Sequence, residues 1–236
     1  MAVNRPAAGG GREILVTPDR ITKWVDGFDA RHAVSALTAT ETGVRAEAAD
    51  GAVAECFLPL GATLPHGAPQ PTQAAGWGAL LEFFAVAANR RRTVGAVIAR
   101  RGAFAVGVFD GDTLVRSKVD TTYVQGRTAA GGWSQQRYAR RRSNQAGKAV
   151  KAAADVVHRL LAGSVDDLYA VVTAGDRDMV TAILADPRLD RVGNRVHPPH
   201  FGDVAEPRLA TLKKLPEWFR VVRIHLTEPD GDPSQR

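Results

Sequence analysis

The residues best suited to chemistry stand together in one short stretch, Gly131-Gly132-Trp133-Ser134-Gln135-Gln136. Its two glycines permit a positive φ and a close approach of the backbone to a ligand. A glutamine amide is not a general base, but together with backbone N–H groups it can orient a water molecule and bind developing negative charge. These groups suit the hydrolysis of an ester, which needs an oriented water and a stabilised oxyanion but no metal and no other cofactor.

The segment around this stretch is strongly basic. Between Thr121 and Ala154 there is no Asp or Glu. The positive charge of the seven Arg and Lys residues there exceeds the net charge of the whole chain, which is +6. At about 100° per residue, a helix that starts at Ser134 places most of these cations in one sector and an apolar stripe from Tyr138 to Leu160 opposite them. We expect the apolar face to be buried and the basic face to contact nucleic-acid phosphates, although a merely solvated face would show the same pattern. The cations assigned to this contact are Arg127, Arg137, Arg140, Arg141, Lys148 and Lys151.

The stretch from Gly131 to Arg140 resembles the peptide-releasing middle domain of eukaryotic and archaeal class-1 release factors. That domain carries Gly-Gly-Gln-Ser, two further residues, and then Arg-aromatic-Ala-Arg. The flanking pattern is similar too, because three strands precede the stretch and a long basic helix follows it. The resemblance extends from about Thr93 to Leu226 and does not include residues 1–77. The matching positions are Gly131, Gly132, Ser134, Arg137, Tyr138, Ala139 and Arg140.

One position departs from the release-factor pattern. The third residue of the pattern is Gln in those factors and Trp133 here, and the glutamines follow at Gln135 and Gln136. This shift is similar to the Gly-Ser-Gln pattern of the Vms/ANKZF-type hydrolases of ribosome quality control, which include an actinobacterial branch. The comparison implies that Gln135, directly after Ser134, is the catalytic residue, with Gln136 as the second candidate. Trp133 could stack on an RNA base or pack on the sheet.

The resemblance implies that the chain hydrolyses the ester of peptidyl-tRNA on a stalled or split large ribosomal subunit. The expected partners are therefore that subunit and peptidyl-tRNA, and we expect a cytoplasmic monomer without a cofactor or a metal. Two alternatives stay open: a non-catalytic ribosome- or RNA-binding factor, and a nuclease that cuts near the acceptor end of tRNA. Asp166-Asp167 could supply carboxylates to such a nuclease, but the sequence shows no partner carboxylate.

The elements that must position this stretch divide into a small module and a larger domain. We expect a disordered leader at 1–12, an N-terminal α+β module at 13–60, a Pro/Gly-rich linker at 61–77, the release-factor-like domain at 78–226 and a disordered tail at 227–236. In the module, a helix should begin at Thr17-Pro18 and two strands should cover 35–48 and 52–58.

The larger domain should contain strands and helices in mixed order. We expect a helix at 80–88, strands at 93–100, 103–109 and 113–122, a helix at 134–161 with Ser134 as N-cap, a strand at 167–173, a helix at 177–184, a short strand at 191–197, a helix at 206–214 and a last strand at 217–226. This order predicts an α/β (α+β) fold in which helices pack on a mixed sheet. The resemblance implies the ribonuclease H-like type of the release-factor middle domain.

Other features limit the range of function. Cys56 is the single cysteine, so no intramolecular disulfide can form, and we expect it to be a small buried hydrophobic residue. The N-terminal stretch lacks the apolar segment of a secretory signal, and no run of about 18 apolar residues indicates a membrane helix. His197 and His200 flank two prolines and are poorly spaced for a metal site.

Overall fold

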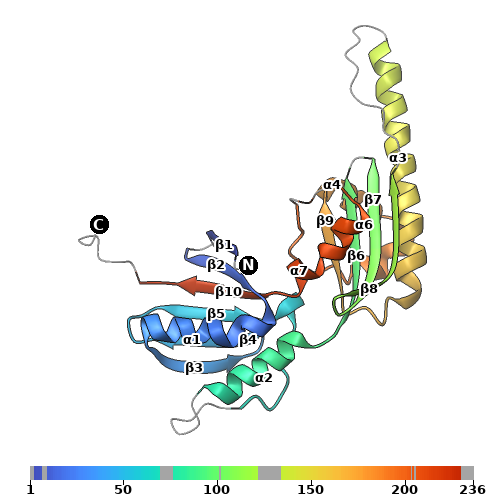
Figure 1. The fold of residues 1–236 in the computed structure, drawn as a ribbon. Helices are drawn as coiled ribbons and strands as arrows, with labels where there is room; N and C mark the ends of the chain where they lie inside the picture. The colour runs from blue at the N-terminus through green and yellow to red at the C-terminus, as the bar shows by residue number, and fades with distance from the viewer. Residues whose placement is uncertain are drawn as a thin grey trace. The chain divides into compact units, whose positions relative to one another are not determined.

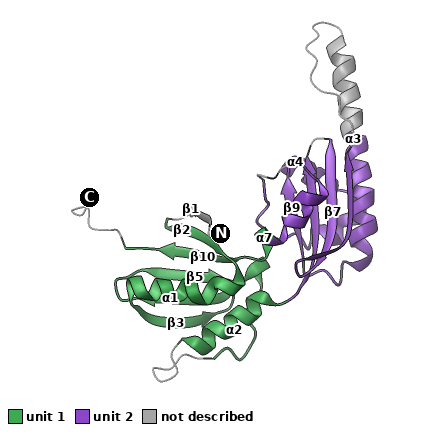
Figure 2. Cartoon of the chain, viewed as in Figure 1, with its two compact units in different colours: residues 1–90, 217–236 green, residues 91–216 purple. Residues whose placement is uncertain are grey.

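Two compact units make up the protein (Figure 2), one formed by residues 1–90 and 217–236 and the other by residues 91–216. The structure is a computed structural model that describes residues 3–6, 10–69, 77–100, 102–121, 134–202, 204 and 206–229, with the side chains of 3–6 and 134–146 outside the description. Each unit is a β-sheet with helices packed on it, and the second sheet is mixed, so the expected α/β class is confirmed. No helix in these ranges is both long and apolar enough to cross a membrane.

The first unit is built on an antiparallel six-stranded sheet of order β1-β2-β10-β5-β4-β3. Its strands are β1 (Val3–Pro6), β2 (Arg12–Val16), β3 (Val34–Thr40), β4 (Gly43–Ala48), β5 (Val53–Phe57) and β10 (Val222–Thr227). Helices α1 (Ile21–His32) and α2 (Gly78–Asn89) pack on the sheet (Figure 1), and η1 (Pro18–Arg20) and η2 (Pro59–Gly61) are short 3-10 turns. Alternate strand residues such as Val44, Cys56 and Ile224 are buried against Phe28 and Phe84 of these helices.

The last strand, β10, lies in the first unit, whereas we expected it in a domain of residues 78–226. It pairs antiparallel with β2 on one side and with β5 on the other, and helix α2 also packs in this unit's core. The physical reason is that β10 alternates buried Val222, Ile224 and Leu226 with outward residues, which suits a sheet covered on one face. The unit boundary therefore falls after Arg90 and again after Pro216, and not in the linker.

Several smaller expectations about the first unit differ from the structure. Part of the expected leader forms β1, paired with β2, and the expected tail begins with Thr227 still in β10. The region 35–48 forms two strands, because the chain reverses at Glu41-Thr42, a turn without the usual Asn-Gly or Asp-Gly signal. After Thr17, the chain makes the 3-10 turn η1 before α1 begins.

The second unit holds a four-stranded mixed sheet of order β8-β7-β6-β9. Strands β6, β7 and β8 are antiparallel neighbours, and β9 runs parallel to β6. The strands are β6 (Thr93–Arg100), β7 (Ala103–Asp110), β8 (Thr113–Thr121) and β9 (Ala170–Gly175). The helices are α3 (Ser134–Leu161), α4 (Arg177–Leu184), α5 (Asp190–Gly193) and α6 (Leu209–Lys214), with 3-10 turns η3 (Ala162–Ser164) and η4 (Pro187–Leu189). Helix α7 (Pro216–Phe219) begins at the unit boundary, and its residues from Glu217 onward belong to the first unit.

Helices cover both faces of this sheet, which explains why β6 and β7 are buried along almost their whole length. On one face, Val97 and Val106 belong to the same buried cluster as Val157 of α3 and Ile183 of α4. On the other face, a Cβ added at Gly107 would lie 2.9 Å from the side chain of Leu212 in α6.

Most elements expected for this unit are confirmed. The helices at 134–161 and 177–184 have the expected bounds, and the three strands before α3 match within a residue. The strand expected at 167–173 starts later, at Ala170. The short strand expected at 191–197 is wrong, because this region forms α5 and then a single parallel bridge between Val196 and Val171.

Glycine substitutions test the close packing of β9 on β6. Gly175 has a φ of +91° and a Cβ there would lie 2.2 Å from the carbonyl oxygen of Ala99. We expect Gly175→Ala to lower the free energy of unfolding, measured by urea titration, by about 1–3 kcal/mol or more. Gly147 is an exposed residue inside α3, and no atom lies near a Cβ added there. Gly147→Ala should therefore raise the free energy of unfolding by about 0.5–1 kcal/mol. A neutral Gly175→Ala variant would contradict the observed contact.

The thiol of Cys56 offers a test of the first unit's core. Cys56 is buried on β5, as expected, and burial raises the pKa of its thiol to about 12. Because the thiolate is the reactive form, we expect no modification by a thiol reagent at pH 8 in the native protein and rapid modification in denaturant. Rapid native-state labelling would show that this core opens readily.

Candidate functional site

The segment that carries the Gly-Gly stretch joins β8 to α3. Residues 122–133, with Arg127, Gly131, Gly132 and Trp133, lie outside the described residues. Their attachment points are described: Thr121 at the end of β8 pairs with Ala103, the first residue of β7. Arg100 at the end of β6 pairs with the same Ala103, and Gly175 at the end of β9 pairs with Ala99. The segment therefore leaves the sheet at the edge where the parallel strands β6 and β9 end, the usual place for sites in α/β folds.

Hydrogen bonds fasten this edge of the sheet. The ring of His200 lies between two groups of β9, with Nδ1 3.0 Å from Thr173 Oγ1 and Nε2 2.9 Å from the carbonyl oxygen of Gly175. Because a carbonyl only accepts, Nε2 carries the proton, and in the neutral ring Nδ1 accepts from the threonine hydroxyl. Asp176 caps α4 by accepting the Met179 N–H at 3.1 Å. The Arg100 guanidinium donates to the carbonyl of Val204 at 2.7 Å.

Ser134, Gln135 and Gln136 form the first turn of α3. We expected Ser134 to precede the helix as its N-cap, whereas it is the first helical residue, a difference within the usual uncertainty of helix ends. The first N–H groups of an α-helix have no acceptor within the helix, and they carry a partial positive charge. The backbone here therefore offers hydrogen-bond donors next to the two glutamines, whose side chains lie outside the description.

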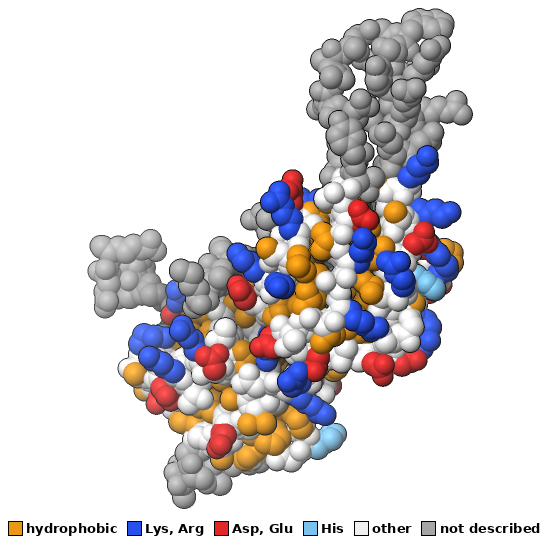
Figure 3. All heavy atoms as spheres, turned by 45° about the vertical axis from the view of Figure 1, so that its right-hand side comes forward, with side chains coloured by type: hydrophobic (Ala, Val, Ile, Leu, Met, Phe, Trp, Pro, Cys, Tyr) orange, Lys and Arg blue, Asp and Glu red, His pale blue; other side chains and the backbone are white. Residues whose placement is uncertain are grey.

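Helix α3 has two distinct faces over its described side chains. Ala149, Ala153 and Val157 are buried against the sheet, as the apolar stripe predicts. Lys148 and Lys151 are exposed, and no ion pair among the described residues engages either of them. Figure 3 shows Lys and Arg side chains over the visible side of this unit, with single acidic side chains between them. The other cations assigned to this face, Arg137, Arg140 and Arg141, lie on the same helix before Gly147, where side chains are not described.

One feature of the basic face was not anticipated. Asp155 falls in the same helical sector as Lys148, one turn after Lys151. Arg188 neutralises the charge of Asp155. The Nη2 atom of Arg188 lies 2.7 Å from Asp155 Oδ1 and also 2.7 Å from Asp186 Oδ2. The hydrogen bond from Arg188 also lowers the pKa of Asp186 to about 2. Asp155 and Arg188 are 33 residues apart, and no local pattern links them.

Comparison with known proteins identifies the family. Residues 92–225 match the family model described as the Actinobacteria/chloroflexi VLRF1 release factor, which is more than half of the chain. The chain belongs to the VLRF1 release-factor family. The match begins one residue before β6 and ends inside β10, so it includes the Gly131–Arg140 stretch and the whole of α3.

Solved structures give a more distant likeness. An archaeal translation termination factor, aRF1, is 18% identical and has a TM-score of 0.40, over 73% of this chain and 49% of that one. A structure described as an archaeal protein is also 18% identical, with a TM-score of 0.35, over 72% of this chain and 48% of that one. The VLRF1-family chain thus spans about half the length of these archaeal chains. No curated protein matches it.

The exposed lysines of α3 generate a test of the basic face. We expect Lys148→Ala/Lys151→Ala to weaken binding of fluorescently labelled tRNA, measured by anisotropy, because both side chains are exposed cations that attract phosphate. Each lost phosphate contact should reduce the slope of log affinity against log salt by about 0.7–0.9. Lys213→Ala/Lys214→Ala removes the same charge from exposed positions on α6 and serves as the control. Equal effects of the two double variants would mean that only net charge matters.

Proposed function

We propose that this VLRF1-family protein hydrolyses the ester bond of peptidyl-tRNA on a stalled or split large ribosomal subunit in the cytoplasm. The observation that carries the proposal is the family match over residues 92–225, which encloses the Gly131–Arg140 stretch. Helix α3 adds physical support, because it combines a first turn rich in donors with exposed lysines farther along the same helix. The partners of the reaction are the ribosomal subunit, peptidyl-tRNA and water.

The chemistry needs positioning more than acid–base power. The oxygen of a water molecule attacks the ester carbonyl carbon, the negative charge moves to the carbonyl oxygen, and the bond to the ribose oxygen then breaks. The peptide leaves with a free carboxylate, and the ribose oxygen takes up a proton. A glutamine amide and the first N–H groups of α3 can hold the water and stabilise the oxyanion. We assign the remaining proton transfers to RNA and solvent, because a glutamine side chain does not titrate.

Helix geometry implies that the two glutamines are not equivalent. Successive residues of an α-helix point about 100° apart, so Gln135 and Gln136 cannot both face the same ester from the first turn. We assign the catalytic role to Gln135 because it directly follows Ser134, as in the Gly-Ser-Gln pattern of Vms/ANKZF-type hydrolases. Gly131 and Gly132 would let the preceding backbone approach the end of the tRNA.

The basic face of α3 would hold the RNA while the first turn acts. Arg137, Arg140 and Arg141 follow within five residues of Gln136, and Lys148 and Lys151 continue the same sector about two to three turns later. Arginine is suited to this role because its guanidinium binds phosphate through two parallel hydrogen bonds. Ion pairing between Arg188 and Asp155 keeps an acidic residue in this sector from repelling the phosphates.

The nuclease alternative finds less support among the described side chains. Asp166, one of the two carboxylates considered for it, forms an ion pair with Arg191. That pairing occupies the carboxylate with a cation of the protein itself.

Single substitutions of the glutamines test the proposal directly. Purified protein is incubated with ribosome–nascent-chain complexes that carry end-labelled peptidyl-tRNA, and free peptide and tRNA are resolved on gels. We expect Gln135→Ala to slow release by about 100-fold or more, the usual effect of losing one oxyanion donor, and Gln136→Ala to slow it less. Gln145→Ala changes the same residue type later in α3 and is the control.

The products distinguish the three functions. Intact tRNA together with free peptide supports hydrolysis, whereas a shortened tRNA would identify a nuclease. Binding to the complexes without any reaction would identify a non-catalytic factor. If Gln135→Ala and Gln145→Ala released peptide equally fast, the assigned role of Gln135 would be wrong.

A further inference from the structure

An exposed aromatic residue lies at the edge of the second sheet opposite to the one where β8 ends at Thr121. Tyr169 directly precedes β9, and its N–H donates to the carbonyl of Thr93 at the start of β6 with an N–O distance of 2.8 Å. The guanidinium carbon of Arg92 lies 5.0 Å from the centre of the tyrosine ring. Tyr169 is nevertheless 42% exposed, so the ring retains accessible surface beside Arg92.

The chain on the other side of β9 brings a second arginine to the same edge. Val171 donates its N–H to the carbonyl of Arg195 at 2.7 Å, and Val171 and Val196 form a parallel bridge. Since β9 is flanked by β6 and by this segment, Arg92, Tyr169 and Arg195 stand on three adjacent segments. Neighbouring strands in a sheet are about 4.8 Å apart, so the backbones of these three segments lie side by side at this edge.

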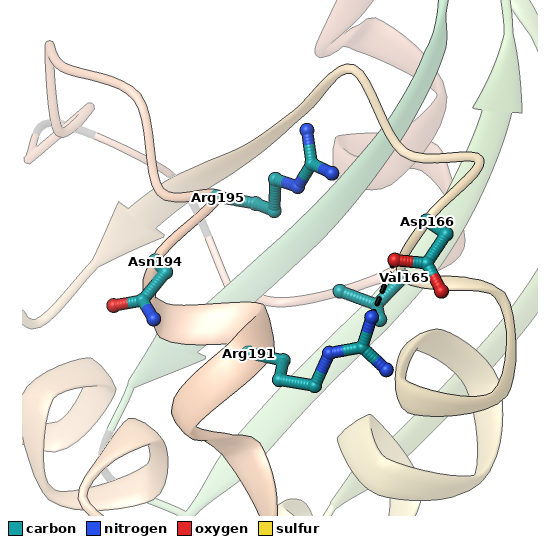
Figure 4. Close-up of a pocket in the computed structure, with 5 residues that line it drawn as sticks. All are labelled: Val165, Asp166, Arg191, Asn194 and Arg195. Atoms are coloured by element: carbon teal, nitrogen blue, oxygen red, sulfur yellow. Dashed lines mark hydrogen bonds and ion pairs between the residues drawn. The ribbon is translucent and has the colours of Figure 1, made fainter.

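A shallow open pocket of about 160 Å³ adjoins Arg195 and is lined by Val165, Asp166, Arg191, Asn194 and Arg195. Figure 4 shows the side chains of Arg191 and Arg195 extending toward the segment with Asp166, whereas Asn194 points away. Asp166 forms an ion pair with Arg191. Among the described residues, no hydrogen bond or ion pair engages the guanidinium of Arg195.

These groups match the two parts of a nucleotide. An exposed tyrosine ring next to a guanidinium is a platform on which an unpaired base can stack. Arginine is the side chain best shaped for a phosphate, and here one guanidinium is without a protein partner while a second is held close by. The pocket is large enough for a phosphate group and too small for a folded peptide. Asp166 opposes the anion, and it therefore limits the affinity of the site.

We propose that Tyr169, Arg92, Arg191 and Arg195 form a second RNA-binding site, which takes one unpaired nucleotide of single-stranded RNA. The base stacks on Tyr169 beside Arg92, and the phosphate binds Arg195 with Arg191. The choice of RNA as the ligand rests on the proposed function at the ribosome, but the site is separate from the glutamines and from the basic face of α3. All four residues of the site belong to the second unit.

Binding of a short RNA tests the site without a ribosome. An eight-nucleotide single-stranded RNA with a fluorescent label is titrated with the full-length protein, and anisotropy gives the affinity. We expect Tyr169→Ala to weaken binding about fivefold or more, and Tyr169→Phe to restore it, because stacking needs the ring and not the hydroxyl. Arg195→Ala should weaken binding and reduce the salt slope by about 0.7, as expected for one lost phosphate contact on a single strand.

Matched variants make the result specific. Asp166→Asn should tighten binding, because it removes the negative charge beside the phosphate, and Lys213→Ala should have no comparable effect because it lies on α6. All the substituted side chains are exposed or at the pocket, and equal melting temperatures would show that the fold is unchanged. Tyr169→Ala and Arg195→Ala variants that bind RNA like the unmodified protein would overturn the proposal. Tight binding of a free mononucleotide without binding of the RNA would overturn it as well.

The experiments distinguish a failure of the proposed nucleotide site from a failure of the proposed release function. The RNA titration depends on Tyr169 and Arg195 and is repeated in the Gln135→Ala variant. If that variant still binds RNA through Tyr169 but the unmodified protein releases no peptide, the nucleotide site stands and the release function fails. If peptide is released with the expected glutamine dependence but RNA binding does not depend on Tyr169, the release function stands and the nucleotide site is wrong.

Discussion

The contact of helix α3 with the mixed sheet is the constraint on which the candidate site depends. Ala149 and Ala153 are small and buried, so the helix backbone lies close to the strands, and Val157 and Leu161 fill the space farther along. At the far end, a Cβ added at Gly95 of β6 would lie 3.3 Å from Leu161, which shows how closely the strand and the helix approach. This packing fixes the rotation of the helix about its axis. The sector opposite the alanines, with Lys148 and Lys151, must then face away from the sheet.

Local sequence patterns predicted the second unit well because its elements are marked by local signals. The apolar stripe from Tyr138 to Leu160 defined α3, and Asp110-Gly111 defined the hairpin between β7 and β8. The exposure of Lys148 and Lys151 followed from the same helical periodicity. Periodicity of this kind arises because a helix or a strand has to bury one side, and this requirement does not depend on the partner element.

The remaining features depend on partners that are distant in sequence, and no local pattern encodes them. The alternation of buried and exposed residues in β10 predicts a strand but does not indicate its neighbours. It could therefore not show that β10 lies between β2 and β5 in the first unit. The ion pair of Arg188 with Asp155, and the hydrogen bonds of His200 with Thr173 and Gly175, connect residues that only the fold brings together. In the first unit, the turn at Glu41-Thr42 was missed because it lacks the residues that usually mark a hairpin.

The position of β10 also limits how the family's sequence can be divided. The family match runs from residue 92 to residue 225 and so ends within a strand that completes the sheet of the other unit. A fragment cut to the matched residues would carry most of β10 without β2 and β5, and its backbone N–H and C=O groups would lack their partners. Because unpaired strand edges promote aggregation, the two units are better treated as one polypeptide in which both ends return to the first sheet.

The two proposed RNA contacts fall at opposite edges of one sheet, and this arrangement favours a large ligand. The eight residues of β7 span about 26 Å, which separates the edge at Thr121 from the edge at Tyr169. Helix α3, with 28 residues and a length of about 42 Å, packs on the same sheet and carries Lys148 and Lys151 on its exposed face. No small molecule reaches across such a distance, whereas a folded RNA presents phosphates and unpaired bases at this spacing. Each contact alone would be weak and sensitive to salt, but contacts on one rigid sheet engage the same RNA together, and the second binds at a high effective concentration.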